Sequence, residues 1–163
     1  MRVVSWFSCG VASAVATKLA QKEAQTKYPG CEFVIANCEL KEEHEDNRRF
    51  LKDCEEWFDQ EIIQLGNDDF SRSIYEVFEK TRFLVGPTGA RCTGELKKKV
   101  RYKFEKPDDV LVFGYTTNER HRAERFIEQN FDTAIWPVLI DAGLTHNDCT
   151  QIIKRAGIEI PMM

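Results

Sequence analysis

The chain of 163 residues has no pair of cysteines with the spacing C-x-x-C and no histidines with the spacing H-E-x-x-H. The absence of these spacings argues against a metal site. We therefore predict that none of its side chains ligates a metal ion. In a reducing compartment most of the cysteines would remain thiols. The six cysteines are Cys9, Cys31, Cys38, Cys54, Cys92 and Cys149.

Long apolar segments are also absent. Only a short apolar run precedes Ser8, too short for a signal peptide or a membrane span, so we expect a cytoplasmic protein without membrane contact. No internal repeat or long linker interrupts the chain, and we predict a single domain over residues 1–163. With 23 basic and 27 acidic residues, the net charge of −4 argues against a wholly basic nucleic-acid binder but allows a local basic patch.

An apolar run near the N-terminus passes through a short turn into an alanine-rich segment. Residues 3–7 are mostly apolar, a Ser-Cys-Gly turn follows, and the next glycine or proline is Pro29. This pattern predicts a buried strand, a tight turn and a helix N-terminus. Unpaired amides and the helix dipole at such a turn suit a phosphate or sulfate, and Ser8, Gly10 and Ser13 favour its close approach. An ordinary strand-to-helix turn with a serine cap fits the same spacing.

Strands and helices alternate along the rest of the chain. This order predicts a three-layer α/β fold, a mainly parallel sheet with helices on both faces. Ligands in such sheets lie beyond the carboxyl ends of the strands, where residues 8–13 and 114–125 fall. Residues 134–140 are predicted to be extended, and Pro137 makes them an edge segment or a loop. Glycine and proline make residues 85–90 a loop. The other predicted strands are 32–37, 61–65 and 110–114, and the predicted helices are 14–27, 45–59, 70–80, 91–104, 119–130 and 145–156.

Two clusters of basic residues follow loops in this slightly acidic chain. Arginine binds phosphate or sulfate through paired hydrogen bonds and lysine binds it as a point charge, so the clusters predict an anion site. Two solvated helix faces are the alternative. Cys92, beside Arg91 and near Lys97, is a candidate reactive thiol with a lowered pKa, and a structural cysteine is the alternative. The clusters are Arg91, Lys97, Lys98, Lys99, Arg101 and Lys103, and Arg120, Arg122 and Arg125.

The order Ser-x-Gly-x-x-Ser after a strand resembles the PP-loop of the adenine nucleotide alpha-hydrolase-like superfamily, which includes the N-type ATP pyrophosphatases and the phosphoadenylyl-sulfate (PAPS) reductases. The common form of that loop is Ser-Gly-Gly-x-Asp-Ser. Ser8, Gly10 and Ser13 match it, whereas Cys9 replaces a glycine and Ala12 replaces the aspartate that helps the pyrophosphatases to organise metal and triphosphate. The resemblance implies a nucleotide-binding role for Ser8, Cys9, Gly10, Val11, Ala12 and Ser13.

Three later stretches resemble the PAPS reductase branch of that superfamily. Residues 91–97 are similar to a cysteine-rich motif in which a lysine lies five residues after the first cysteine, with Thr93 in place of the second cysteine. Residues 114–125 are similar to a Gly-x-Arg segment with a following Glu and Arg. Residues 136–161 look like the Pro-Leu, Thr and Gly-Ile-Pro run near the C-terminus of that family. The resemblance implies a catalytic thiol at Cys92 and nucleotide-binding roles for Lys97, Gly114, Arg122 and Arg125.

The resemblance implies a PAPS reductase-like oxidoreductase that binds an adenine nucleotide, namely PAPS, adenosine bisphosphate or ATP. Familiar PAPS reductases attack the sulfonate with a cysteine near the C-terminus, and no cysteine follows Cys149 here. Iron–sulfur relatives need four cysteines in two pairs, so we expect no iron–sulfur cluster in this chain.

Two alternatives stay open beside the reductase. One is a PP-loop ATP pyrophosphatase that adenylates a nucleic-acid base before sulfur insertion and needs Mg²⁺. The other is a non-catalytic nucleotide-binding protein of the same fold, which Cys9, Ala12 and Thr93 favour. An enzyme is the preferred interpretation. The partners compatible with the sequence are the small-molecule nucleotide, a thiol redox protein, nucleic acid at the basic segment 97–103, and a second copy in a homodimer.

Overall fold

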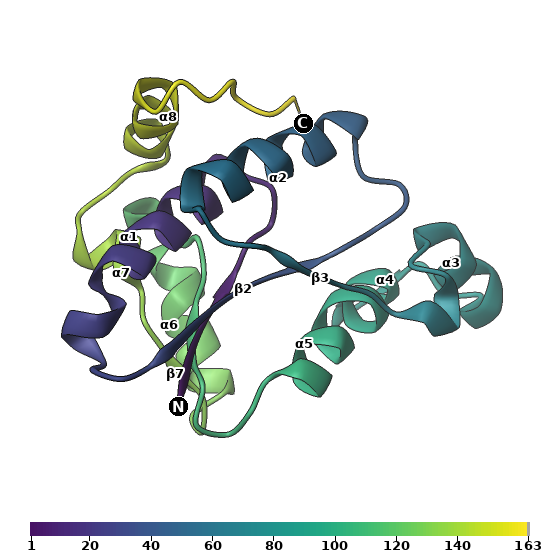
Figure 1. Ribbon diagram of the computed structural model, residues 1–163. Coiled ribbons are helices and arrows are strands. Elements are labelled where there is room, and N and C mark those ends of the chain that lie inside the picture. The colour runs from purple at the N-terminus through teal and green to yellow at the C-terminus, as the bar shows by residue number, and fades with distance from the viewer. Residues whose placement is uncertain (163) are drawn as a thin grey trace.

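A parallel β-sheet forms the centre of the protein (Figure 1). The computed structural model describes residues 1–162. The five strands of the sheet all run parallel, in the order β3-β2-β1-β6-β7, which confirms the predicted parallel α/β sheet. A separate antiparallel ladder joins β4 to β5. The strands are β1 (Arg2–Trp6), β2 (Glu32–Cys38), β3 (Ile63–Leu65), β4 (Val85–Gly86), β5 (Gly89–Ala90), β6 (Val110–Val112) and β7 (Ala134–Ile135).

Helices connect the strands, as the alternating sequence pattern predicts. Within residues 1–162, no helix combines the length and the apolar character needed to cross a membrane. The helices are α1 (Val11–Lys27), α2 (Glu45–Phe58), α3 (Ile74–Thr81), α4 (Arg91–Thr93), α5 (Lys99–Phe104), α6 (Arg120–Gln129), α7 (Val138–Asp141) and α8 (His146–Arg155), with the single turns η1 (Asp68–Phe70), η2 (Gly94–Lys98) and η3 (Thr117–Glu119).

Alternation of side chains along β1 builds a core on each face of the sheet. Val3 and Phe7 belong to the cluster formed with α1, α2 and α8. Val4 and Trp6 point to the other face, where Phe104 of α5 and one aromatic ring of α6 pack against them. Because helices cover both faces, the central strands are apolar along nearly their whole length.

The helix predicted over 70–80 begins only at Ile74, after the turn η1. Three further segments differ from the sequence prediction. Residues 134–140, predicted to be extended, hold only the short β7 before the helical turn α7, because Pro137 caps a turn whose apolar side chains are buried. Residues 85–90, predicted as a loop, form the β4–β5 ladder, in which Gly89 has the positive φ (103°) that the tight turn requires. The predicted helix 91–104 is helical throughout, but its middle turn, η2, is π-helical.

The strand order reverses between β1 and β6. The chain continues from β1 to β2 on one side and from β6 to β7 on the other, and such a reversal opens a crevice at the carboxyl ends of the strands. Gly114, two residues after β6, lines a cavity at this position. A Cβ atom on Gly114 would lie 2.6 Å from the amide nitrogen of Ser13 and 2.8 Å from its Cα. The backbone after β6 therefore touches the first turn of α1, and only glycine fits at position 114.

Replacement of Gly114 by alanine tests this close approach. Because the new Cβ would collide with backbone, we expect Gly114→Ala to lower the free energy of unfolding by about 1–3 kcal/mol. Gly94→Ala is the control, since a Cβ at Gly94 has no atom within 4 Å and alanine favours a helix. Denaturant unfolding followed by circular dichroism measures both variants. A Gly114→Ala protein as stable as the wild type would contradict the contact.

Candidate functional site

A cavity of about 700 Å³ opens at the carboxyl ends of β1 and β6. Its size is within the range of small-molecule sites. It is lined by the turn between Ser8 and Ser13, by parts of the basic helical segment 93–102, and by parts of the segment 113–130. Residues 160–161 border it as well. The fold therefore brings the predicted phosphate turn to one cavity with part of each basic cluster, namely Lys97, Lys98 and Arg101 of the first and Arg122 of the second.

The turn after β1 leaves the N-terminus of α1 without a side-chain cap. Cys9 adopts a left-handed conformation (φ 60°), and Gly10 is the N-cap residue in an extended conformation. No side chain in the described part of the chain caps this end. The first amides of a helix have no partner within it, and the 17 residues of α1 add their dipole. The turn thus presents N–H groups and partial positive charge to the cavity.

The two serines of the turn have different environments. Ser13 is buried, and its hydroxyl accepts a hydrogen bond from the amide of Ser8 (3.1 Å) and donates one to the carbonyl of Gly10 (2.9 Å). Ser8 is exposed, and its hydroxyl lies 3.1 Å from that of Ser13. The side chain of Asn37, in β2, donates to the carbonyl of Phe7 at 2.8 Å and supports the turn from the neighbouring strand. Ser13 therefore braces the turn, while the hydroxyl of Ser8 is accessible.

Lys97 and Lys98 supply unpaired positive charge to the cavity. Both side chains line it and are exposed, and neither forms an ion pair with any residue between 1 and 162. Arg101, one turn later, is paired with Glu105 at 2.8 Å, and its guanidinium carbon lies 4.8 Å from the centre of the Phe113 ring. An anion in the cavity would therefore meet two lysines that are free to pair with it.

Of Arg122 and Arg125, the two arginines of α6 that were predicted to bind the nucleotide, only Arg122 lines the cavity. Arg122 lines the cavity, 5.5 Å from the ring centre of Tyr115, and pairs with Glu119. Burial by itself would raise the pKa of Glu119, but hydrogen bonds from the Thr116 amide and from Arg122 hold that pKa below its usual value. Glu119 is therefore charged at neutral pH and competes with a ligand for Arg122. Arg125 is exposed and lies outside the cavity lining.

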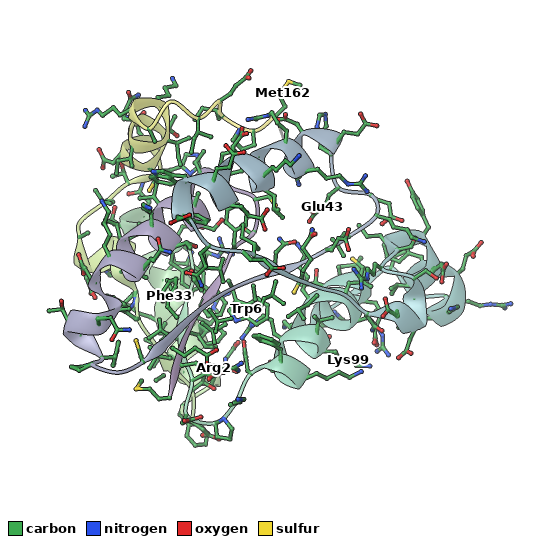
Figure 2. All side chains as sticks on the ribbon, viewed as in Figure 1. Arg2, Trp6, Phe33, Glu43, Lys99 and Met162 are labelled. Atoms are coloured by element: carbon green, nitrogen blue, oxygen red, sulfur yellow. The ribbon has the colours of Figure 1, made fainter. Side chains whose placement is uncertain are left out.

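Aromatic rings form much of the remaining wall. The ring centre of Phe113 lies 5.1 Å from that of Phe126 and 5.5 Å from that of Tyr115. Trp6, labelled in Figure 2, packs edge-on against a ring of α5. Its indole Nε1 and the Nη2 of Arg101 are buried donors with no acceptor among residues 1–162. The faces and edges of the three rings suit a planar group of a ligand.

The thiols near the cavity are poorly disposed to ionise. Burial raises the pKa of Cys9 to about 12, and it raises the pKa of Cys38, which lines the cavity, to about 11. Cys92, predicted as the catalytic thiol, is half-buried and packs against the small cluster of Leu40, Val77 and Leu96. It does not line the cavity, although its neighbour Thr93 does. The structure thus separates Cys92 from the phosphate turn.

The sequence analysis assigned no site role to the aromatic wall or to several polar lining residues, among them Asn37 and Glu43. Asn37 is a polar residue at the end of a predicted apolar strand, which is a signal for a site at the sheet edge. Glu43, labelled in Figure 2, lies in the acid-rich stretch before α2 and carries no distinguishing pattern. Burial raises its pKa, opposed by the charge of Lys97 and a hydrogen bond from Asn47. Within residues 1–162, no three His, Cys, Asp or Glu side chains are grouped to hold a metal ion.

Comparisons with known proteins assign no family to the chain. No protein-family model matches the sequence, and no curated protein sequence matches it. The case for a function therefore rests on the geometry of the cavity: the uncapped helix end, the two unpaired lysines and the aromatic wall.

The burial of the thiols predicts an order of reactivity toward iodoacetamide, which reacts with thiolates. Burial raises the pKa of both Cys9 and Cys54 to about 12, so at pH 8 both should react far more slowly than half-buried Cys92. Because Cys92 does not line the cavity, saturating adenosine 3′,5′-bisphosphate should leave its labelling rate unchanged. Mass-spectrometric peptide mapping measures the rates. Slower labelling of Cys92 in the presence of the nucleotide would contradict this and would indicate that Cys92 belongs to the candidate site.

Proposed function

We propose that the cavity binds an adenine nucleotide, in a domain of the adenine nucleotide alpha-hydrolase-like fold. The observation that carries the proposal is a single cavity that joins the uncapped N-terminus of α1 to Lys97, Lys98 and an aromatic wall. Helix N-termini bind phosphate through their free amides and their dipole. The reversal of strand order puts this helix end at the position where doubly wound sheets take up nucleotides.

The two halves of the cavity suit the two ends of a nucleotide. The Ser8–Ser13 turn offers amides and a hydroxyl to a phosphate, and the rings of Phe113, Tyr115 and Phe126 offer faces and edges on which a base can pack. The cavity thus combines positive charge for the phosphate with apolar surface for the base.

The lysines support a nucleotide with two anionic groups. A monophosphate at the turn uses the amides of α1 and the Ser8 hydroxyl, which leaves Lys97 and Lys98 for a second anion. PAPS and adenosine 3′,5′-bisphosphate carry two separate anionic groups and need no Mg²⁺ to offset repulsion within a triphosphate. A PAPS reductase-like activity is therefore the proposed function. Since the thiol pKa values at the cavity are raised, the reducing thiol would come from a redox partner protein.

A PP-loop ATP pyrophosphatase that adenylates a nucleic-acid base is the second candidate. The observation in its favour is Glu43, a carboxylate that lines the same cavity as the turn and could replace the acid missing at Ala12 in binding Mg²⁺. This function requires Mg²⁺-dependent binding of ATP and release of pyrophosphate, whereas the reductase-like function requires neither.

Charge placed at the helix end tests the proposed phosphate site. Gly10 has an ordinary extended conformation (φ −106°), and a Cβ there would meet only the Ser8 hydroxyl, at 3.7 Å. Aspartate and asparagine are both good N-cap residues, so Gly10→Asp and Gly10→Asn should fold at least as stably as the wild type. The aspartate would occupy the phosphate site with negative charge. We expect Gly10→Asp to weaken binding of adenosine 3′,5′-bisphosphate by at least about tenfold relative to Gly10→Asn.

Isothermal titration calorimetry measures the two affinities, and thermal unfolding checks that both variants are folded. The comparison isolates charge, because the two side chains have nearly the same shape and both cap the helix. Equal affinities for the aspartate and asparagine variants would place the phosphate elsewhere and refute the proposal.

A further inference from the structure

Positive charge is concentrated in one part of the chain. Residues 80–106 hold nine lysines and arginines and two glutamates, a formal charge of +7 in a protein of net charge −4. This segment contains β4, β5, α4, η2 and α5, and Figure 1 shows its helices gathered with α3 to one side of the sheet. Such a concentration within an acidic protein indicates an anionic partner at this part of the surface.

A second cavity, of about 530 Å³, lies on this part of the protein and is here named the basic groove. Thr93 and Lys98 line both the basic groove and the first cavity, so the two adjoin along one side of the helical segment 91–104. An elongated ligand could therefore extend from one into the other. The groove is lined by Phe83, Thr88, Gly89, Ala90, Arg91, Thr93, Gly94, Glu95, Lys98 and Lys99.

The basic groove keeps a net positive charge after its internal ion pairs are counted. Its one carboxylate, Glu95, is buried and pairs with both Arg91 (2.9 Å) and Lys99 (2.7 Å). Lys98 forms no ion pair with any residue of the described chain. One buried negative charge is thus set against three positive charges at the surface. The groove can accept further negative charge without first breaking an ion pair.

Exposed aromatic and apolar side chains accompany these charges. Phe83, which lines the groove, is 46% exposed and Tyr102, which lines the first cavity, is 58% exposed. The Phe83 ring lies over Gly86 of β4, where a Cβ atom would come within 2.7 Å of the ring, so the hairpin supports the ring from below. Leu84 and Val85 beside it are exposed as well. Cations next to supported, accessible rings are what single-stranded nucleic acids bind.

We propose that the basic groove binds single-stranded nucleic acid. Arg91, Lys98 and Lys99 contact the phosphates, and an unpaired base stacks on Phe83. A duplex keeps its bases inside its stack, so the Phe83 ring would contribute nothing to duplex binding. An acidic protein would satisfy the lysines but would not specifically use a flat ring. Lys98 borders both cavities, but Phe83, Arg91 and Lys99 lie outside the lining of the first, so this proposal can be tested separately from nucleotide binding.

Fluorescence anisotropy of the full chain with labelled 12-nucleotide probes tests the proposal. The probes are oligo(dT), oligo(U) and a DNA duplex of the same length, at 50 and 200 mM salt. We expect both single strands to bind more tightly than the duplex, and both to weaken with salt. Phe83→Ala should weaken single-strand binding about tenfold. Lys99→Ala should weaken it less and should lower the slope of log affinity against log salt by about one.

Matched controls use exposed residues elsewhere. Phe131→Ala removes a phenylalanine that is 89% exposed, and Lys22→Ala removes an exposed lysine of α1. Neither control should change single-strand binding, and none of the four variants should change binding of adenosine 3′,5′-bisphosphate. Duplex binding as tight as single-strand binding would overturn the proposal, as would an unchanged affinity in Phe83→Ala. Displacement of the strand by polyglutamate at equal charge concentration would identify an acidic protein surface as the partner instead.

Discussion

The contact between Gly114 and the first turn of α1 determines the geometry of the whole cavity. It joins the end of β6 to the helix that follows β1, so the phosphate turn and the segment leading into α6 have one fixed relation. A Cβ at position 114 would collide with the backbone of Ser13, so these two segments would have to move apart. The aromatic wall would then move away from the helix N-terminus. The proposed nucleotide site thus depends on a packing constraint as much as on charge.

The parts of the site that could be predicted are encoded locally. The apolar strand, the Ser-Cys-Gly turn and the alanine-rich helix follow one another without a break, so the helix N-terminus was visible in the sequence. The parallel sheet followed from the alternation of strands and helices. The prediction that residues 134–140 are extended was wrong beyond β7. Pro137 caps a helical turn there, because the apolar residues after it are buried against α1 rather than in the sheet.

The parts that could not be predicted depend on how helices rotate against the sheet. Ala123 and Phe126 turn inward on α6. Arg122 precedes Phe126 by one turn, so it lies on the same side of the helix and reaches the cavity. Arg125 is adjacent to Phe126 and therefore about 100° away around the helix, in solvent. Cys92 is turned toward a small cluster under α3 for the same kind of reason. Charge and spacing in a sequence do not record this rotation, because tertiary packing sets it.

The central claim is that the cavity takes an adenine nucleotide with two anionic groups and no metal. Calorimetric titration with AMP, adenosine 3′,5′-bisphosphate and ATP, each with and without Mg²⁺, tests it most directly. The account predicts that the bisphosphate binds about tenfold or more tightly than AMP, because one further charge-assisted contact contributes about 1.5–3 kcal/mol. Lys97→Ala should remove most of that preference, and Arg125→Ala should not. Tight, Mg²⁺-dependent binding of ATP with release of pyrophosphate would contradict the claim.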